Sequence, residues 1–218
     1  VNIYEEKVPK YSGKIKKVSV IIPNYNYENF IVERIDSILN QSYPIYELII
    51  LDDKSTDNSV NVIKEKINSI KNIKVRFVEN EKNTGSPFSQ WQKGISLVEG
   101  DYFWIAEADD SAHPLFLETT MKAFENKNVI LSYTDSARID ENNNLIAKNS
   151  QDLYNIYGTN RWDRPYINKG TDEIINYLSI TNTILNVSGV VWKKGDYNQI
   201  IEEAKQFKVA GDWYIYYK

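Results

Sequence analysis

Residues 18–26 read VSVIIPNYN, and this stretch decides the fold of the chain. Four of its first five residues are Val or Ile, which is typical of a strand buried on both faces, and Pro23 ends the apolar run. Helical spacing follows at once, because Ile31, Ile35 and Ile38 recur every three or four residues. A buried strand followed by an amphipathic helix predicts the opening of an alternating α/β domain.

The same alternation continues along the chain. Further strands are expected at 48–51, 75–78, 102–106, 129–133 and 187–192, and further helices at 60–70, 88–95, 117–124, 172–179 and 200–207. The fold class predicted is therefore α/β, with a mostly parallel central sheet and helices on both faces. Residues 136–170 break the pattern, since they are rich in Asn, Asp and Tyr, and are expected to be irregular.

Composition excludes several classes of protein. A length of 218 residues fits one large domain or one domain with an appendage. The absence of cysteine rules out a disulfide scaffold and a thiolate nucleophile. A net charge of −4 argues against a general nucleic-acid binder. The 16 tyrosines suit a sugar or nucleoside surface, although a tyrosine-rich core is the favoured alternative.

The two ends of the sequence differ from the middle. Residues 1–17 carry five lysines without a clear period, and we expect an N-terminal arm there, as a solvated tail rather than a basic contact with a membrane. The chain does not begin with Met and stops in the aromatic stretch 213–218, so we expect a fragment truncated at its C-terminus. No apolar run approaches the roughly 18 residues that a membrane span requires.

Polar groups follow three of the expected strands, where ligands bind in open α/β sheets. They are residues 23–26, 52–57 and 107–110. Neighbouring carboxylates repel each other, and a hard cation shared with phosphate oxygens relieves the repulsion, so 107–110 predicts a Mg²⁺ or Mn²⁺ site for a diphosphate. A helix cap explains the same residues equally well. A carboxylate in 52–57 could accept the N3–H of uracil or thymine, or the segment could cap the next helix. His113 is a possible further ligand, although packing beside Pro114 is favoured.

Taken in order, these motifs resemble glycosyltransferase family 2, which has the GT-A fold. The resemblance rests on VSVIIPNYN at 18–26, DDKSTD at 52–57 and GDY at 100–102. It covers residues 18–135, with a second anchor at 186–213. It implies a GT-A domain over 18–218, with a nucleotide-binding part over 18–135 and an acceptor part over 136–218.

The resemblance also implies an activity. The family inverts anomeric configuration as it moves a sugar from a nucleoside-diphosphate sugar, a UDP-sugar first of all, to a glycan or lipid-linked acceptor. Its cofactor is a divalent cation, Mn²⁺ or Mg²⁺, and its usual context is polysaccharide biosynthesis. We therefore expect no nucleic-acid partner, and a cytoplasmic location with peripheral association at the inner face of the membrane as an option.

Site residues carry over from the family position by position. Pro23 and Tyr25 would line the nucleoside pocket, and Asp53 would contact the base with Asp52 beside it. Asp109 would bind the metal. The remaining donor-binding positions are Glu107, where the family motif has Asp, and Asp110, for the ribose or the acceptor. The family's Ala-Arg-Asn is replaced by Gln90-Trp91-Gln92 here, so the contacts of that Arg do not transfer.

The late Gly211-Asp212 pair matches the place of the family's general base, which makes Asp212 the predicted catalytic residue; a helix cap is the alternative. Trp162 and Arg164 are candidates for acceptor contact, with loop packing favoured, and Ser188 is expected near the acceptor mouth. A rival interpretation is a non-catalytic module that binds a sugar nucleotide or glycan. A nucleotidyltransferase is disfavoured, because residues 23–26 lack the glycine and lysine that grip a triphosphate.

Overall fold

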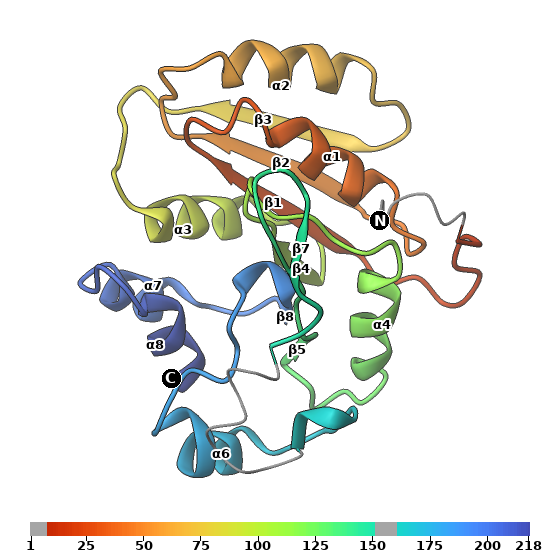
Figure 1. Cartoon of the computed structure of the whole chain (residues 1–218), viewed down its shortest axis with the longest axis vertical. Coiled ribbons are helices and arrows are strands. Elements are labelled where there is room, and N and C mark those ends of the chain that lie inside the picture. Colours follow the sequence, from red (N-terminus) through yellow and green to blue (C-terminus); the bar gives the residue numbers. More distant parts are fainter. Residues whose placement is uncertain (1–7, 151–160) are drawn as a thin grey trace.

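The computed structural model describes residues 8–150 and 161–218. Its central sheet has six strands in the order β3-β2-β1-β4-β8-β5 (Figure 1). The strand bounds are β1 Val18–Asn24, β2 Glu47–Asp52, β3 Lys74–Glu79, β4 Tyr102–Ile105, β5 Leu131–Tyr133 and β8 Val190–Lys193. Strands β1 to β4 pair in parallel, and only β8 runs against its neighbours β4 and β5. The predicted α/β class and mostly parallel sheet are confirmed.

Helices cover both faces of this sheet. Their bounds are α1 Ile31–Leu39, α2 Ser59–Asn68, α3 Pro87–Leu97, α4 Phe116–Ala123, α6 Gly170–Glu173, α7 Asn198–Ala204 and α8 Gly211–Tyr217. The alternation of side chains along β1 separates two cores: Val20 and Ile22 pack with α1 and α4, whereas Ile21 packs with α3, α7 and α8. In Figure 1 the helices α3, α7 and α8 accordingly gather at one side of the sheet.

Three local predictions are corrected by the structure. Pro23 does not end β1, which pairs with β2 as far as Asn24. The pairing of β1 with β4 stops at Ile21, so a backbone N–H at position 23 would have no partner in β4, and proline is tolerated there. Region 136–170 is not wholly irregular, because β6 Arg138–Ile139 and β7 Leu145–Ala147 form a hairpin. The helix expected at 172–179 is α6 followed by a π-helical turn, Ile174–Leu178.

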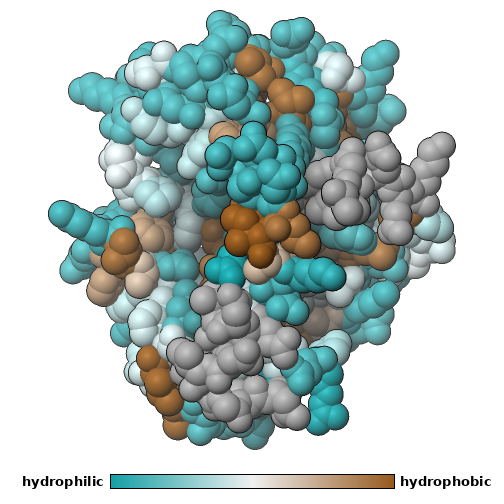
Figure 2. Space-filling view, viewed as in Figure 1, coloured by the Kyte–Doolittle hydropathy of each residue, from teal (hydrophilic) through white to brown (hydrophobic). Residues whose placement is uncertain are grey.

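The hairpin exposes part of its apolar surface. Ile139, Leu145 and Ile146 are all exposed side chains of β6 and β7. In the space-filling view, hydrophobic residues gather in the middle of an otherwise mostly hydrophilic face (Figure 2). The tip of the hairpin reaches α1, where the Nδ2 group of Asn143 lies 3.3 Å from Oε2 of Glu33.

The described part of the N-terminal arm packs against the domain. The N–H of Tyr11 donates to the carbonyl of Ser42 at 3.0 Å, and its ring lies 4.8 Å from that of Tyr43. The ammonium group of Lys16 donates to the carbonyl of Phe124. The arm is thus attached to the domain at Tyr11 and Lys16, whereas seven of its ten described residues are exposed, as expected of a solvated segment. Across 8–150 and 161–218, the helices are all too short or too polar to cross a membrane.

Candidate active site

The loops that follow β1, β2 and β4 leave the sheet at one edge. Asn24 and Asp52 are partners in the β1–β2 register, and the N–H of Ala106 donates to the carbonyl of Ile21 at 2.8 Å. Because these strands are parallel, the sequence motifs that follow them meet at this edge. Pro23 is buried within β1, and Tyr25, just beyond it, is 44% exposed. Tyr25 is thus available for contact with a ligand.

Asp52 organises the turn after β2. Its carboxylate is fully buried and accepts hydrogen bonds from Nδ2 of Asn24 at 2.8 Å, from the N–H of Ser55 at 2.9 Å and from the Ser55 hydroxyl. The backbone of Lys54 adopts the left-handed conformation with a φ of 64°, which closes the turn. A buried carboxylate is stable only where hydrogen-bond donors compensate its charge. Asp52 has such donors, and these hydrogen bonds hold the loop in place.

Asp53 is surrounded by hydrogen-bond donors from two later segments. They are Nδ2 of Asn80 at 2.7 Å, the N–H and hydroxyl of Thr84 at 3.0 and 2.8 Å, and Nε2 of Gln90 at 2.8 Å. An ionised carboxylate offers about four lone-pair positions, and these donors fill them. A nucleobase that bonds to Asp53 must therefore share or displace one of these donors.

The acidic cluster after β4 consists of Glu107, Asp109 and Asp110. Oε1 of Glu107 accepts a 2.7 Å hydrogen bond from the indole N–H of Trp91. Burial of the carboxyl group raises the pKa of Glu107 to about 7, and the charges of Asp109 and Asp110 add to this, against the opposing effects of Trp91 and Arg34. Burial is thus the main cause of the raised pKa, and the neighbouring carboxylates Asp109 and Asp110 contribute less.

Tyr27 belongs to the same cluster, although the sequence analysis did not single it out. Its hydroxyl lies near enough to the Asp109 carboxylate for that charge to affect its pKa. Burial, followed by the charge of Asp109, raises the pKa of Tyr27 to about 12. Arg34 of α1 is fully buried nearby, with its guanidinium 4.8 Å from the centre of the Trp104 ring. Neither residue carried a signal in the sequence beyond its place on the predicted loop or helix.

These residues fit one kind of metal site. Within the described ranges, no three His, Asp or Glu side chains lie close enough to hold an ion by themselves. Adjacent carboxylates at Asp109 and Asp110 suit a cation whose remaining ligands are phosphate oxygens and water. His113 is exposed, and its Nδ1 accepts the N–H of Leu115 at 3.2 Å, so that nitrogen does not face the acidic cluster.

Asp212 lies in the first turn of α8, and the residue at the helix cap is Ala210, with a φ of 63°. The alternative that Asp212 caps this helix is therefore wrong. Its Oδ2 lies 3.2 Å from Nδ2 of Asn182. One turn further on, burial and then the charges of Asp212 and Glu107 raise the pKa of Tyr216 well above its ordinary value. Asp212 also lines the same gap as Trp91, whose indole donates to Glu107, so Asp212 lies near the acidic cluster.

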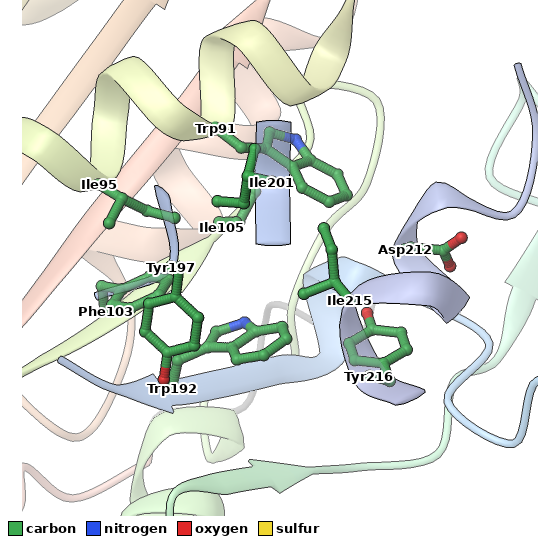
Figure 3. Close-up of a pocket in the computed structure, with 10 residues that line it drawn as sticks. All are labelled: Trp91, Ile95, Phe103, Ile105, Trp192, Tyr197, Ile201, Asp212, Ile215 and Tyr216. Carbon is green, nitrogen blue, oxygen red and sulfur yellow. The ribbon is translucent and has the colours of Figure 1, made fainter. Parts of the chain in front are cut away.

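An apolar gap lies beneath Asp212. It is lined by Trp91, Trp192, Tyr216 and several Ile side chains, and the Asp212 carboxylate points away from it (Figure 3). The gap is thus part of the core formed by α3, α7 and α8. The surface that these walls expose to the gap is apolar, so the gap does not serve as the sugar site.

The remaining candidates lie elsewhere. Ser188 is buried, not at an open mouth, and its hydroxyl accepts the N–H of Glu107 at 2.9 Å, so it supports the acidic loop. The Trp162 ring packs edge-on to Tyr177 at 6.2 Å. Arg164 is exposed. The roles of Trp162 and Arg164 toward an acceptor stay predictions.

Comparison with known proteins identifies relatives of this arrangement. The model of the family described as "Glycosyl transferase family 2" matches residues 19–186. A poly(ribitol-phosphate) beta-glucosyltransferase of Bacillus spizizenii is 36% identical over 96 residues, which are 43% of this chain and 15% of that protein. The chain spans 15% to 21% of the length of three curated relatives that it matches.

Two solved structures share the fold. TarS of S. aureus in complex with UDP superposes with a TM-score of 0.59 at 17% identity, covering 92% of this chain and 54% of that one. The mannosyltransferase PcManGT of Pyrobaculum calidifontis, in complex with GDP-Man and Mn²⁺, gives a TM-score of 0.55 at 21% identity over 70% of this chain and 42% of that one. At these identities the similarity extends to the fold alone.

Proposed function

The chain belongs to glycosyltransferase family 2, and from this premise we propose that it transfers a sugar, with inversion, from a nucleoside-diphosphate sugar to a hydroxyl of a glycan or lipid-linked acceptor. One observation carries the proposal. The carboxylates of the loop after β4 lie at the edge where β1 and β2 end, and Asp212 lines the same gap as Trp91, whose indole donates to Glu107. Such an edge suits a cation-bound diphosphate with a base beside it.

The donor is assigned to the β1 to β4 half of the edge. Tyr25 and Pro23 would line the nucleoside pocket, with Asp53 at the base and Asp52 behind it. Asp110 would meet the ribose. UDP is the first candidate, because TarS is solved with UDP, and GDP is the second, because PcManGT is solved with GDP-Man. Residues 136–218 would form the part of the domain that binds the acceptor.

Asp109 would hold the cation, Mn²⁺ or Mg²⁺, and Asp110 or Glu107 would complete its protein surroundings. When bound, the cation supplies positive charge against the negative charge that builds on the leaving diphosphate. Tyr27, which lies near Asp109, would help to orient this carboxylate. The PcManGT complex with Mn²⁺ supports a divalent ion in this fold.

Asp212 would act as the general base. Its carboxylate takes the proton of the acceptor hydroxyl while that oxygen attacks the anomeric carbon from the face opposite the leaving diphosphate. A single displacement of this kind inverts the anomeric centre and needs no covalent intermediate. The role in polysaccharide biosynthesis and the cytoplasmic location, with peripheral membrane association as an option, belong to the same proposal.

A thermal-shift panel tests the proposal. The chain is heated with UDP, GDP and their sugar derivatives, each with MnCl₂ and with EDTA. We expect at least one nucleotide to raise the melting temperature with Mn²⁺ and to lose that effect with EDTA, because a ligand of the native state stabilises it. If no nucleotide has an effect in either condition, the proposal is wrong. Binding without transfer to any acceptor would favour the non-catalytic module.

A further inference from the structure

Two consecutive residues of α3 reach two different parts of the candidate site. Gln90 donates to Oδ1 of Asp53 at 2.8 Å, and Trp91 donates to Oε1 of Glu107 at 2.7 Å. We propose that Trp91 is a positioning residue: its indole N–H tethers the Glu107 carboxylate so that the acidic cluster is ordered before a nucleoside diphosphate and its cation bind. The inference rests on the proposed function and deepens it.

Glu107 needs such a tether. Its side chain has three rotatable bonds and belongs to the same short acidic loop as Asp109 and Asp110. The backbone is fixed by the hydrogen bond from its N–H to Ser188 at 2.9 Å, but this leaves the carboxylate free to turn. The hydrogen bond from Trp91 restrains Oε1 and does not engage Oε2. An ordered carboxyl group has less entropy to lose when the donor binds.

Trp91 is itself held firmly. It is 5% exposed, and its ring packs edge-on to that of Phe88 with the centroids 4.9 Å apart. Helix α3 also lies close against β1, since a Cβ added at Gly94 would come within 2.4 Å of Cγ2 of Ile21. Close packing on both sides fixes the position of the indole N–H. The tether therefore pulls Glu107 toward a rigid part of the fold.

Gln90 extends the same support to the nucleoside end. Its amide donates to Asp53 and also approaches the hydroxyl of Thr84 at 3.2 Å. The two adjacent side chains thus connect the loop after β2 with the loop after β4. A shift of α3 would move both acidic groups together.

The test measures the affinity of a nucleoside diphosphate by calorimetry. The probe is whichever of UDP and GDP the wild-type chain binds more tightly with Mn²⁺. We expect Trp91→Phe, which keeps the ring but removes the N–H donor, to weaken this affinity about tenfold, in line with the loss of one hydrogen bond to a charged group.

Trp192→Phe is the matched control. Trp192 is also 5% exposed, packs in the same apolar cluster as Trp91, and its indole N–H has no hydrogen-bond partner among the described residues. The substitution removes the same atoms from the same core without removing a tether. We expect its effect on affinity to be less than twofold. Equal losses in the two variants would overturn the proposal.

A double-mutant cycle with Glu107→Ala separates tethering from general damage. If Trp91 acts through Glu107, Trp91→Phe has no further effect once the carboxylate is gone. A full tenfold loss in the Glu107→Ala background would overturn the inference.

The indole N–H signal of Trp91 in a ¹H–¹⁵N spectrum provides a readout without any nucleotide. We expect Glu107→Ala to shift this signal and to leave that of Trp192 in place; an unmoved Trp91 signal would refute the tether. A wild-type chain that binds neither nucleotide would instead refute the proposed function, so the two failures are distinguishable.

Discussion

The carboxylate of Asp212 accepts a hydrogen bond from the side-chain amide of Asn182, with 3.2 Å between Oδ2 and Nδ2. The other end of this amide, Oδ1 of Asn182, accepts the N–H of Ile184 at 3.1 Å. Because the backbone donor occupies the oxygen, the NH₂ group must face Asp212. Asp212 is therefore oriented from a segment 30 residues earlier in the chain.

The first prediction concerns the base itself. Asp212→Asn preserves shape but removes the proton acceptor, so we expect sugar transfer to fall by about 10² to 10⁴-fold, the usual contribution of a general base. Nucleotide affinity and melting temperature should stay near those of the wild type, because Asp212 lies beyond the diphosphate in the proposed site. Turnover like that of the wild type would remove Asp212 from the mechanism.

The second prediction concerns its orienting partner. Asn182→Ala leaves the base present but free to rotate, and we expect transfer to fall by about tenfold, less than for Asp212→Asn, the size of one lost hydrogen bond to a charged group. The control is Asn176→Ala, since the Asn176 amide donates to the carbonyl of Asp172 on the exposed side of the same region. Equal rates for both variants would count against an orienting role.

The third prediction concerns the close packing of α3 against the sheet. Gly94→Ala places a methyl group 2.4 Å from Cγ2 of Ile21, so we expect the free energy of unfolding to drop by about 1–3 kcal/mol through overpacking. Gly170→Ala in α6 is the control, because nothing lies within 4 Å of its added Cβ. Urea titration of both variants measures the difference. A Gly94→Ala chain as stable as Gly170→Ala would contradict the close packing.

The fourth prediction is a pH dependence of stability. Burial raises the pKa of Asp57, but hydrogen bonds from Ser59 and from the N–H of Glu28 outweigh it and hold the pKa below its usual 3.8. A lowered pKa in the folded state means stability that is present above 3.8 and lost as the pH falls through the folded value.

Melting curves from pH 7 downward check this sign. We expect the wild type to melt above Asp57→Ala at neutral pH, and the gap to close in acid. A gap that stays constant across the range would mean that the hydrogen bonds of Asp57 do not depend on its charge.

Much of the fold followed from local patterns. The strands β1, β2 and β4 are apolar runs buried on both faces, and their polar ends could be placed at one edge from the parallel topology alone. The hairpin β6–β7 was not predicted, because apolar and polar residues alternate only weakly along its two short strands and most of their side chains are exposed. The π-helical turn at 174–178 was not predicted, because the spacing of its apolar residues resembles that of an ordinary helix.

The candidate site was harder to predict in detail. The motifs identified the carboxylates, but their partners come from segments without a local signal. Thr84 and Gln90 reach Asp53 across 31 and 37 positions, and Trp91 reaches Glu107 across 16. Trp91 fits an apolar helix face as well as it fits a hydrogen-bond role, so helical spacing cannot distinguish the two. Only the packing of α3 against the sheet reveals the contact.

The most direct test of the central claim is whether the acidic cluster binds a divalent cation together with a nucleoside diphosphate. Electron paramagnetic resonance measures the signal of free Mn²⁺ in solution, and a sample of Mn²⁺ with the nucleotide but no protein serves as the control. We expect the wild-type chain with UDP or GDP to reduce the free Mn²⁺ signal well below that of the control, and Asp109→Asn to leave the signal close to it. A wild-type chain that causes no reduction, or an Asp109→Asn chain that causes as much, would contradict the claim.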